Sequence, residues 1–338
     1  MIIPIHDLKM DNKRRIQWID VSKGILAICV IIGHSKYVPS KIINLIFSFH
    51  IPSFFILSGF LSIYSQEKNI FSFFFKKAKR ILVPYLFFFL IGYFYWLTSC
   101  QFESKKAMCQ AKEWWHPFKG FLLGYGPDLY VSPGLWFLPC LFITEIIYHT
   151  LEKNCKLKNN TTLLISLISI VIFYDFLSIT MPFSFHVIPF SLFFYAFGRK
   201  IHLFKTQLLP FTIKNSYFFL IITLWIYSIL LNGKVDLNNA KHGLTLYLFL
   251  LNSIVGFFVI FLLSKNLKFL FLETTGKAML CILGLNFEML SVASYIIKKL
   301  NLNYNLIINS TITIITILIS CIFRRKMLKY IPRLIGEY

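Results

Sequence analysis

The sequence predicts an all-α polytopic membrane protein with about ten transmembrane helices. Of its 338 residues, 57% are hydrophobic, only 14% are charged and 38 are Phe. The mean hydropathy of +0.68 is high for a soluble domain, in which about 25% of residues are charged. Lipid admits only helices and closed barrels, and the apolar segments show no barrel-type alternation. The composition also excludes disordered, collagen-like, coiled-coil and disulfide-scaffold proteins.

Ten apolar segments approach the roughly 20 residues that a helix needs to cross the hydrocarbon layer. The first and the sixth are short, and we expect them to extend into the flanking residues. The predicted spans are 21–34, 42–64, 81–99, 135–152, 161–180, 185–198, 216–232, 244–264, 278–297 and 305–323.

Basic residues predict the orientation of these spans. With the N-terminus in the cytoplasm, 24 Lys and Arg fall on cytoplasmic segments and ten on outer ones. The positive-inside rule therefore predicts that both termini are cytoplasmic, in a multi-pass protein of the inner or plasma membrane. Anionic lipid, rather than nucleic acid, explains the net charge of +21. We expect a cytoplasmic segment at 1–20, without a cleaved signal peptide, a membrane domain at 21–323 and a cytoplasmic tail at 324–338.

The longest outer segment, 100–134, is expected to hold an interfacial amphipathic stretch. Cys100 and Cys109 both fall in it, on the side of the membrane where a disulfide persists, and are candidates for a bridge. The chain has no zinc motif and no phosphate-binding Gly loop, so we expect no metal. The aromatic and aliphatic residues of the amphipathic stretch within 100–134 are Trp114, Trp115, Phe118, Phe121, Leu122 and Leu123.

Ionisable residues inside a span are costly and therefore mark candidate functional sites. Asp20 and Lys23 are three residues apart and can pair on one helix face, either as an interfacial anchor or as part of a site. His34 follows Lys23 by eleven residues, close to three turns, so both lie on one face about 16 Å apart along the axis. This places a cation near the cytoplasmic end and an imidazole deeper in the bundle.

The second and third spans carry further polar motifs. The second reads FSFHIPSFFILSGFL, in which a Pro and the Ser58–Gly59 pair loosen the helix or permit close helix approach. A basic cluster follows in KKAKRILVPY. Lys77 and Arg80 in this cluster either are ordinary basic residues of a cytoplasmic segment or bind phosphate groups.

Four segments in this order resemble the acyltransferase 3 family of integral membrane O-acyltransferases. They are the run from Arg15 to His34 with its Lys/Arg–ten residues–His spacing, FHIPSFFILSGFL, KRILVPY and GLWFLPCLF at 134–142. Weaker matches, FFYAFGRKI at 193–201 and TGKAMLCILGLN at 275–286, extend the resemblance over nearly the whole chain.

The resemblance implies transfer of an acyl group, usually acetyl from acetyl-CoA, to a hydroxyl of a carbohydrate or lipid-linked glycan. His34 matches the essential histidine of the family, and an imidazole suits removal of a hydroxyl proton near neutral pH. An acyl-His intermediate is the alternative. Asp20 and Lys23 belong to the same motif. Ser58 and Trp136 are candidate oxyanion donors, while Lys77 and Arg80 are candidate ligands of the coenzyme A phosphates.

Other residues leave alternatives open. Glu145 and Asp175 lie in spans and either orient the imidazole or serve as structural hydrogen-bond partners. Asn286 stands where many family members carry a His near the end of the chain. Either Glu288 or another group takes the role of that His in this protein, or the protein functions without it. A transporter or flippase of glycolipid-like cargo is the alternative function, although the two halves of the chain show no convincing repeat.

The orientation is tested with reporter fusions. Fusions after residues 72 and 206 are expected to report a cytoplasmic location, and fusions near residues 110 and 238 an external one. An external reporter at the C-terminus would contradict the even number of spans.

Overall fold

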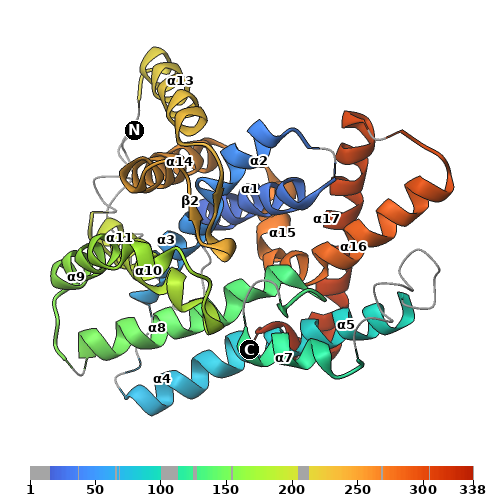
Figure 1. Cartoon of the computed structure of the whole chain (residues 1–338), viewed down its shortest axis with the longest axis horizontal. Coiled ribbons are helices and arrows are strands. Elements are labelled where there is room, and N and C mark those ends of the chain that lie inside the picture. Colours follow the sequence, from blue (N-terminus) through green and yellow to red (C-terminus); the bar gives the residue numbers. More distant parts are fainter. Residues whose placement is uncertain are drawn as a thin grey trace.

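The computed structural model describes most of the chain as helix (Figure 1). In this part of the chain, eight helices are long and apolar enough to cross a membrane. The protein is therefore an all-α polytopic membrane protein, as predicted. The described residues are 16–36, 38–64, 67, 69–99, 113–124, 128–153, 155–204, 213–267, 269–303 and 305–337.

All ten predicted spans coincide with helices, but two of these helices are short. α9 (Asn159–Ile172) has 14 residues and α11 (Ile188–Leu203) has 16, fewer than the roughly 17 that a span requires. The count of ten spans therefore stays a prediction. Five of the eight long helices are α1 (Gln17–His34), α13 (Asn215–Asn232), α14 (Leu246–Asn266), α16 (Met279–Lys299) and α17 (Leu306–Tyr330).

The other three long segments are composite. The second predicted span is interrupted at Ser48–Phe49, between α2 (Ser40–Phe47) and α3 (His50–Ser62). The third consists of α4 (Ile70–Lys77), a π-helical turn η2 (Ala78–Leu82) and α5 (Val83–Ser99). The fourth joins a 3₁₀ turn, η4 (Pro133–Trp136), to α8 (Phe137–Lys153).

The helix of the third span begins much earlier than residue 81, where we expected it to begin. The Asn69 side chain accepts a hydrogen bond from the Phe71 amide at 2.8 Å and so caps α4. Phe73 is buried on the inner face of this helix. The basic cluster therefore lies within a continuous helical segment rather than in a loop before it.

Shorter elements connect the long helices. α10 (Tyr174–Leu177) and the 3₁₀ turn η5 (Pro182–Val187) precede α11, and α15 (Leu270–Lys277) precedes α16. The sequence between α13 and α14 forms a hairpin of β1 (Val235–Asp236), η6 (Leu237–Asn239) and β2 (Lys241–His242). After α17 the chain ends in η7 (Pro332–Ile335).

α3 and α11 pack backbone against backbone at the centre of the molecule. A Cβ on Gly59 would collide with the Tyr195 carbonyl oxygen, and one on Gly198 would collide with that of Ile56. The two glycines therefore permit an approach that any side chain would prevent. α13 and α17 are the least buried of the long helices, with only 17% and 22% of their apolar windows buried, and Figure 1 shows α13 projecting at the upper left and α17 on the right beside α16.

α7 (His116–Leu123), which contains most of the expected interfacial stretch, packs along α5. The Tyr85 hydroxyl donates to the Phe121 carbonyl oxygen at 2.7 Å, and the Tyr93 hydroxyl donates to that of Trp114 at 3.2 Å. The Phe118 and Phe121 rings of this stretch pack with the Phe89 ring of α5. Its location at the membrane interface stays a prediction. Cys100 and Cys109 lie outside the described residues.

Gly59→Val tests the contact between α3 and α11. Because the valine side chain would meet the Tyr195 carbonyl, we expect a loss of stability of about 1–3 kcal/mol or more. The measurement is the thermal unfolding midpoint in detergent. Leu220→Val, at a side chain of α13 that is 54% exposed, is the control and should change stability by less than about 0.5 kcal/mol. Equal midpoints for the two variants would contradict the close approach.

Candidate active site

The face of α1 that carries Lys23 and His34 is turned toward α16. Ala27 and Ile31 lie between them on this face, at successive spacings of four, four and three residues. Both are fully buried and pack against Ile282 of α16. The predicted shared face therefore exists, and it is the surface by which α1 joins the C-terminal part of the bundle.

His34 ends α1 at a junction of three elements. Its ring centroid lies 4.9 Å from that of Phe287 on α16 and 5.6 Å from that of Phe47 at the end of α2. The Phe47 ring in turn lies 5.1 Å from the ring of His50, the first residue of α3. The imidazole is half-buried among aromatic side chains, so its orientation is restricted.

His50 is a second imidazole beside His34. Its Nδ1 lies 2.8 Å from the Ile46 carbonyl oxygen, across the break between α2 and α3. A carbonyl only accepts, so Nδ1 carries the proton and Nε2 of the neutral ring is the acceptor. His50 interacts electrostatically with His34. The hydrogen bond gives His50 a role in joining the two helices.

Asp236 supplies a carboxylate to this junction and was not among the predicted site residues. It belongs to β1, and it lies close enough to His34 to interact with it electrostatically. Its Oδ1 accepts from the Asn239 amide at 3.3 Å and its Oδ2 from Asn239 Nδ2 at 2.8 Å. A single acid in a short loop offers no sequence signal for its place near His34.

Glu145 does not orient His34. Its Oε2 lies 2.9 Å from Lys77 Nζ, and the two side chains are only 6% and 14% exposed. The Lys77 ammonium also lies 5.3 Å from the centre of the Phe73 ring. Glu145 thus has the structural role that we gave as the alternative. The side chain of Asp175, the other candidate, lies outside the described residues.

Asp20 lies in the first turn of α1, where α15 packs closely. A Cβ on Gly276 of α15 would collide with the Asp20 carbonyl oxygen, and one on Gly24 would collide with that of Leu272. The Asp20 side chain is 6% exposed, so α15 covers this end of the motif. The predicted pairing of Asp20 with Lys23 stays a prediction.

The two predicted oxyanion donors lie in different surroundings. Ser58 follows His50 by eight residues, about 12 Å along α3, which separates it from the aromatic contacts of His34. Trp136 is buried at the end of η4. This turn is held to α16, since Ser132 donates to Glu288 Oε1 at 2.7 Å and Gly134 lies against Phe287.

Asn286 and Glu288 flank Phe287 on α16, and both are buried. Asn286 is 1% exposed, and neither atom of its amide has a hydrogen-bond partner among the described residues. Ile282 and Leu290, one turn on either side, join the cluster formed with α1 and α17. Asn286 therefore faces the interior on the same side of α16 as that cluster.

Lys77 and Arg80 point into different surroundings at the predicted cytoplasmic end. Lys77 is engaged with Glu145, whereas Arg80 is exposed on η2. Gly336, just after η7, packs on the Arg80 carbonyl, and Arg324 pairs with Glu337 at 2.7 Å. The residues after α17 therefore pack beside η2. Lys79 borders a largely apolar cavity of about 560 Å³ between α5, α7 and α8.

Comparison with known proteins identifies the family of this chain. The family model described as an acyltransferase domain matches residues 16–325. No curated protein and no solved structure matches the chain. Because the match spans nearly the whole chain, the protein belongs to the acyltransferase 3 family and is a membrane acyltransferase.

Proposed function

We propose that this member of the acyltransferase 3 family transfers an acetyl group from acetyl-CoA to a hydroxyl of a cell-surface carbohydrate or lipid-linked glycan. The observation that carries the proposal is the position of His34. It ends α1 on the face that also holds Lys23, packs on Phe287, and interacts with Asp236 and His50. An imidazole with a nearby carboxylate suits general-base catalysis.

In the proposed reaction, the acceptor oxygen attacks the thioester carbon while His34 takes the hydroxyl proton. The new carbon–oxygen bond forms, the carbon–sulfur bond breaks, and the proton passes from the imidazolium to the departing thiolate of coenzyme A. Asp236 stabilises the transient imidazolium. Trp136 and Ser58 remain proposed oxyanion donors; Trp136 has the stronger support because its turn is anchored to the helix that contacts His34.

The donor is proposed to bind at the end of the bundle that carries the basic cluster. Arg80 is exposed there, and a guanidinium binds a phosphate through two parallel hydrogen bonds. Lys77 contributes positive charge, although its ammonium already pairs with Glu145. In this proposal the donor phosphates lie on the side opposite the C-terminal end of α1.

Substitution of His34 tests the catalytic assignment. We expect His34→Ala to lower acyl transfer by at least about 10²–10⁴-fold, the usual contribution of a general base, while span insertion and donor binding persist. His50→Ala should cost less, since its hydrogen bond to Ile46 explains its position. The measurement is transfer by purified protein, with glycan analysis of a deletion strain to identify the acceptor. A His34→Ala rate within about threefold of wild type would exclude His34 as the base.

Substitutions in the basic cluster test the donor site. Arg80→Ala and Lys77→Ala are both expected to raise the donor KM with kcat unchanged, Arg80→Ala by more because a bidentate contact is lost. Lys77→Ala also leaves Glu145 buried without its partner, at a cost of about 3–5 kcal/mol.

The double variant Lys77→Met, Glu145→Leu separates these effects, because replacing both charges by apolar side chains restores stability. A raised donor KM in this folded double variant supports a phosphate contact by Lys77. If the double variant and Arg80→Ala both bind the donor as the wild type does, the basic cluster does not bind the donor and only sets the orientation of the span.

A further inference from the structure

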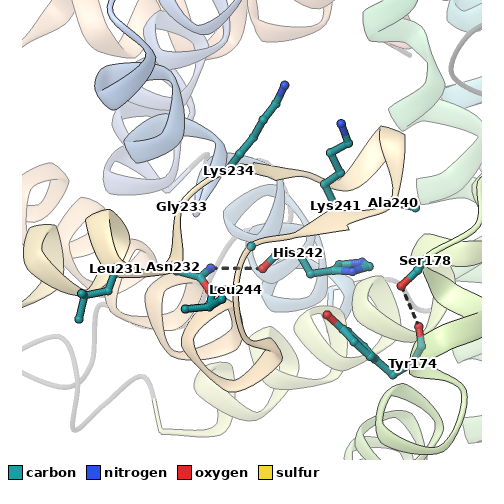
Figure 2. A pocket seen from close by; sticks show the side chains of 11 residues that line it. Tyr174, Ser178, Leu231, Asn232, Gly233, Lys234, Ala240, Lys241, His242 and Leu244 are labelled. Carbon is teal, nitrogen blue, oxygen red and sulfur yellow. Dashed lines mark hydrogen bonds between the residues drawn. The ribbon is translucent and has the colours of Figure 1, made fainter.

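A cavity of about 580 Å³ opens beside the hairpin between α13 and α14, on the predicted outer side. Tyr174 and Ser178 form its opposite wall (Figure 2). Figure 2 shows the Lys234 and Lys241 side chains extending in the same direction, while His242 reaches toward Tyr174 and Ser178. Its volume is within the range of small-molecule sites. We call it the outer cavity.

The hairpin that forms this cavity is held in place from both ends. Asn232 Nδ2 donates to the His242 carbonyl oxygen at 3.2 Å, and Asn232 Oδ1 accepts from the Thr245 amide at 3.0 Å. His186 Nδ1 accepts from the Met181 amide at 3.1 Å, so its Nε2 carries the proton and donates to the Leu237 carbonyl oxygen at 3.0 Å. The outer cavity is therefore preorganised.

The charge of the outer cavity favours an anionic ligand. Lys234 and Lys241 line it and are exposed, and the described lining residues include no Asp or Glu. Neither ammonium has an acidic partner within the described part of the chain. The Asp236 carboxylate lies on the same face of the hairpin as Lys241, and it accepts two hydrogen bonds from Asn239. Two positive charges are thus available to a ligand.

His242 adds a polar atom that has no partner. The side chain is 3% exposed, and its Nε2 has no hydrogen bond among the described residues. The ring stacks on Phe190 with centroids 4.6 Å apart, and burial lowers the pKa of His242 to about 4. The imidazole is therefore neutral near pH 7 and suits a hydrogen bond to a hydroxyl or amide rather than a charge contact.

Lys241 links the outer cavity to the junction at His34, because residues paired directly across an antiparallel ladder point to the same face. Lys241 pairs in register with Asp236, and Asp236 interacts with His34. A molecule held by Lys241 is thereby positioned one strand away from the Asp236 carboxylate. An acceptor bound in this place presents its neighbouring atoms toward the reaction centre.

We propose that the outer cavity binds the acceptor glycan through an anionic group, a carboxylate or phosphate held by Lys234 and Lys241, with His242 Nε2 contacting a neighbouring hydroxyl or amide. This inference rests on the proposed function for the identity of the ligand as acceptor. It goes further in naming an acidic glycan as the substrate class and these three residues as its recognition site.

The first test measures binding without catalysis. Full-length His34→Ala protein in phosphatidylcholine nanodiscs is titrated calorimetrically with glucuronate, inorganic phosphate and glucose. We expect both anions to bind more tightly than glucose, and Lys234→Gln with Lys241→Gln to weaken anion binding by about tenfold or more. Lys298→Gln with Lys299→Gln, which removes two exposed charges on the same predicted side, is the matched control and should not change it.

The second test uses the O-acetyl-deficient glycan from the deletion strain as acceptor. The Lys234→Gln, Lys241→Gln variant should raise the acceptor KM about tenfold or more and leave the donor KM unchanged. His242→Phe keeps the ring stacking and should raise the acceptor KM alone.

Several outcomes would overturn the inference. Equal binding of glucose and glucuronate, or unchanged anion binding in the double lysine variant, removes the anionic site. Binding seen only with phosphatidylglycerol in the nanodisc identifies a lipid headgroup site instead. Wild-type acyl transfer by His34→Ala together with intact anion binding would contradict the proposed general base while leaving the cavity as an anion site.

Discussion

The cost of placing ionisable side chains inside a hydrocarbon layer constrains the whole arrangement. Lys77 pairs with Glu145, Arg199 with Glu152, and Arg324 with Glu337. The first two pairs join segments that are distant in the sequence, so these pairs also fix how the helices are arranged. His34 differs from these pairs, because its neighbours are aromatic rings, a second imidazole and a carboxylate from a loop. Such surroundings hold a side chain that can exchange a proton.

The sequence predicted those parts of the site that depend on one helix. The shared face of Lys23 and His34 follows from helical spacing, and the structure shows this face packed on α16. The sequence did not predict Asp236 or the role of Glu145, because both depend on contacts between distant segments. The break at Ser48–Phe49 was also missed, since the apolar run continues through it. The family motifs identified the membrane acyltransferase, but the partners of each motif residue required three-dimensional packing.

Close helix packing and the exposed loops have separate tasks in this molecule. Glycines allow α3 to meet α11, and α1 to meet α15, without intervening side chains. Such contacts leave little room for movement between these helices. The hairpin between α13 and α14, in contrast, carries polar groups held by local hydrogen bonds. Rigid helices therefore position His34, while a loop supplies the carboxylate beside it.

The identity of residue 286 limits which groups can accept a proton. The resemblance implies a His at this position in many relatives, whereas this chain has Asn286, whose amide is not a base near neutral pH. Glu288 is the nearest ionisable residue in sequence, but one of its oxygens is hydrogen-bonded to Ser132 and the side chain is 4% exposed. Asn286 can still donate or accept a hydrogen bond. We therefore propose that proton transfer in this chain falls to the imidazoles at the junction of α1, α2 and α3, and of these His34 is the one that interacts electrostatically with Asp236.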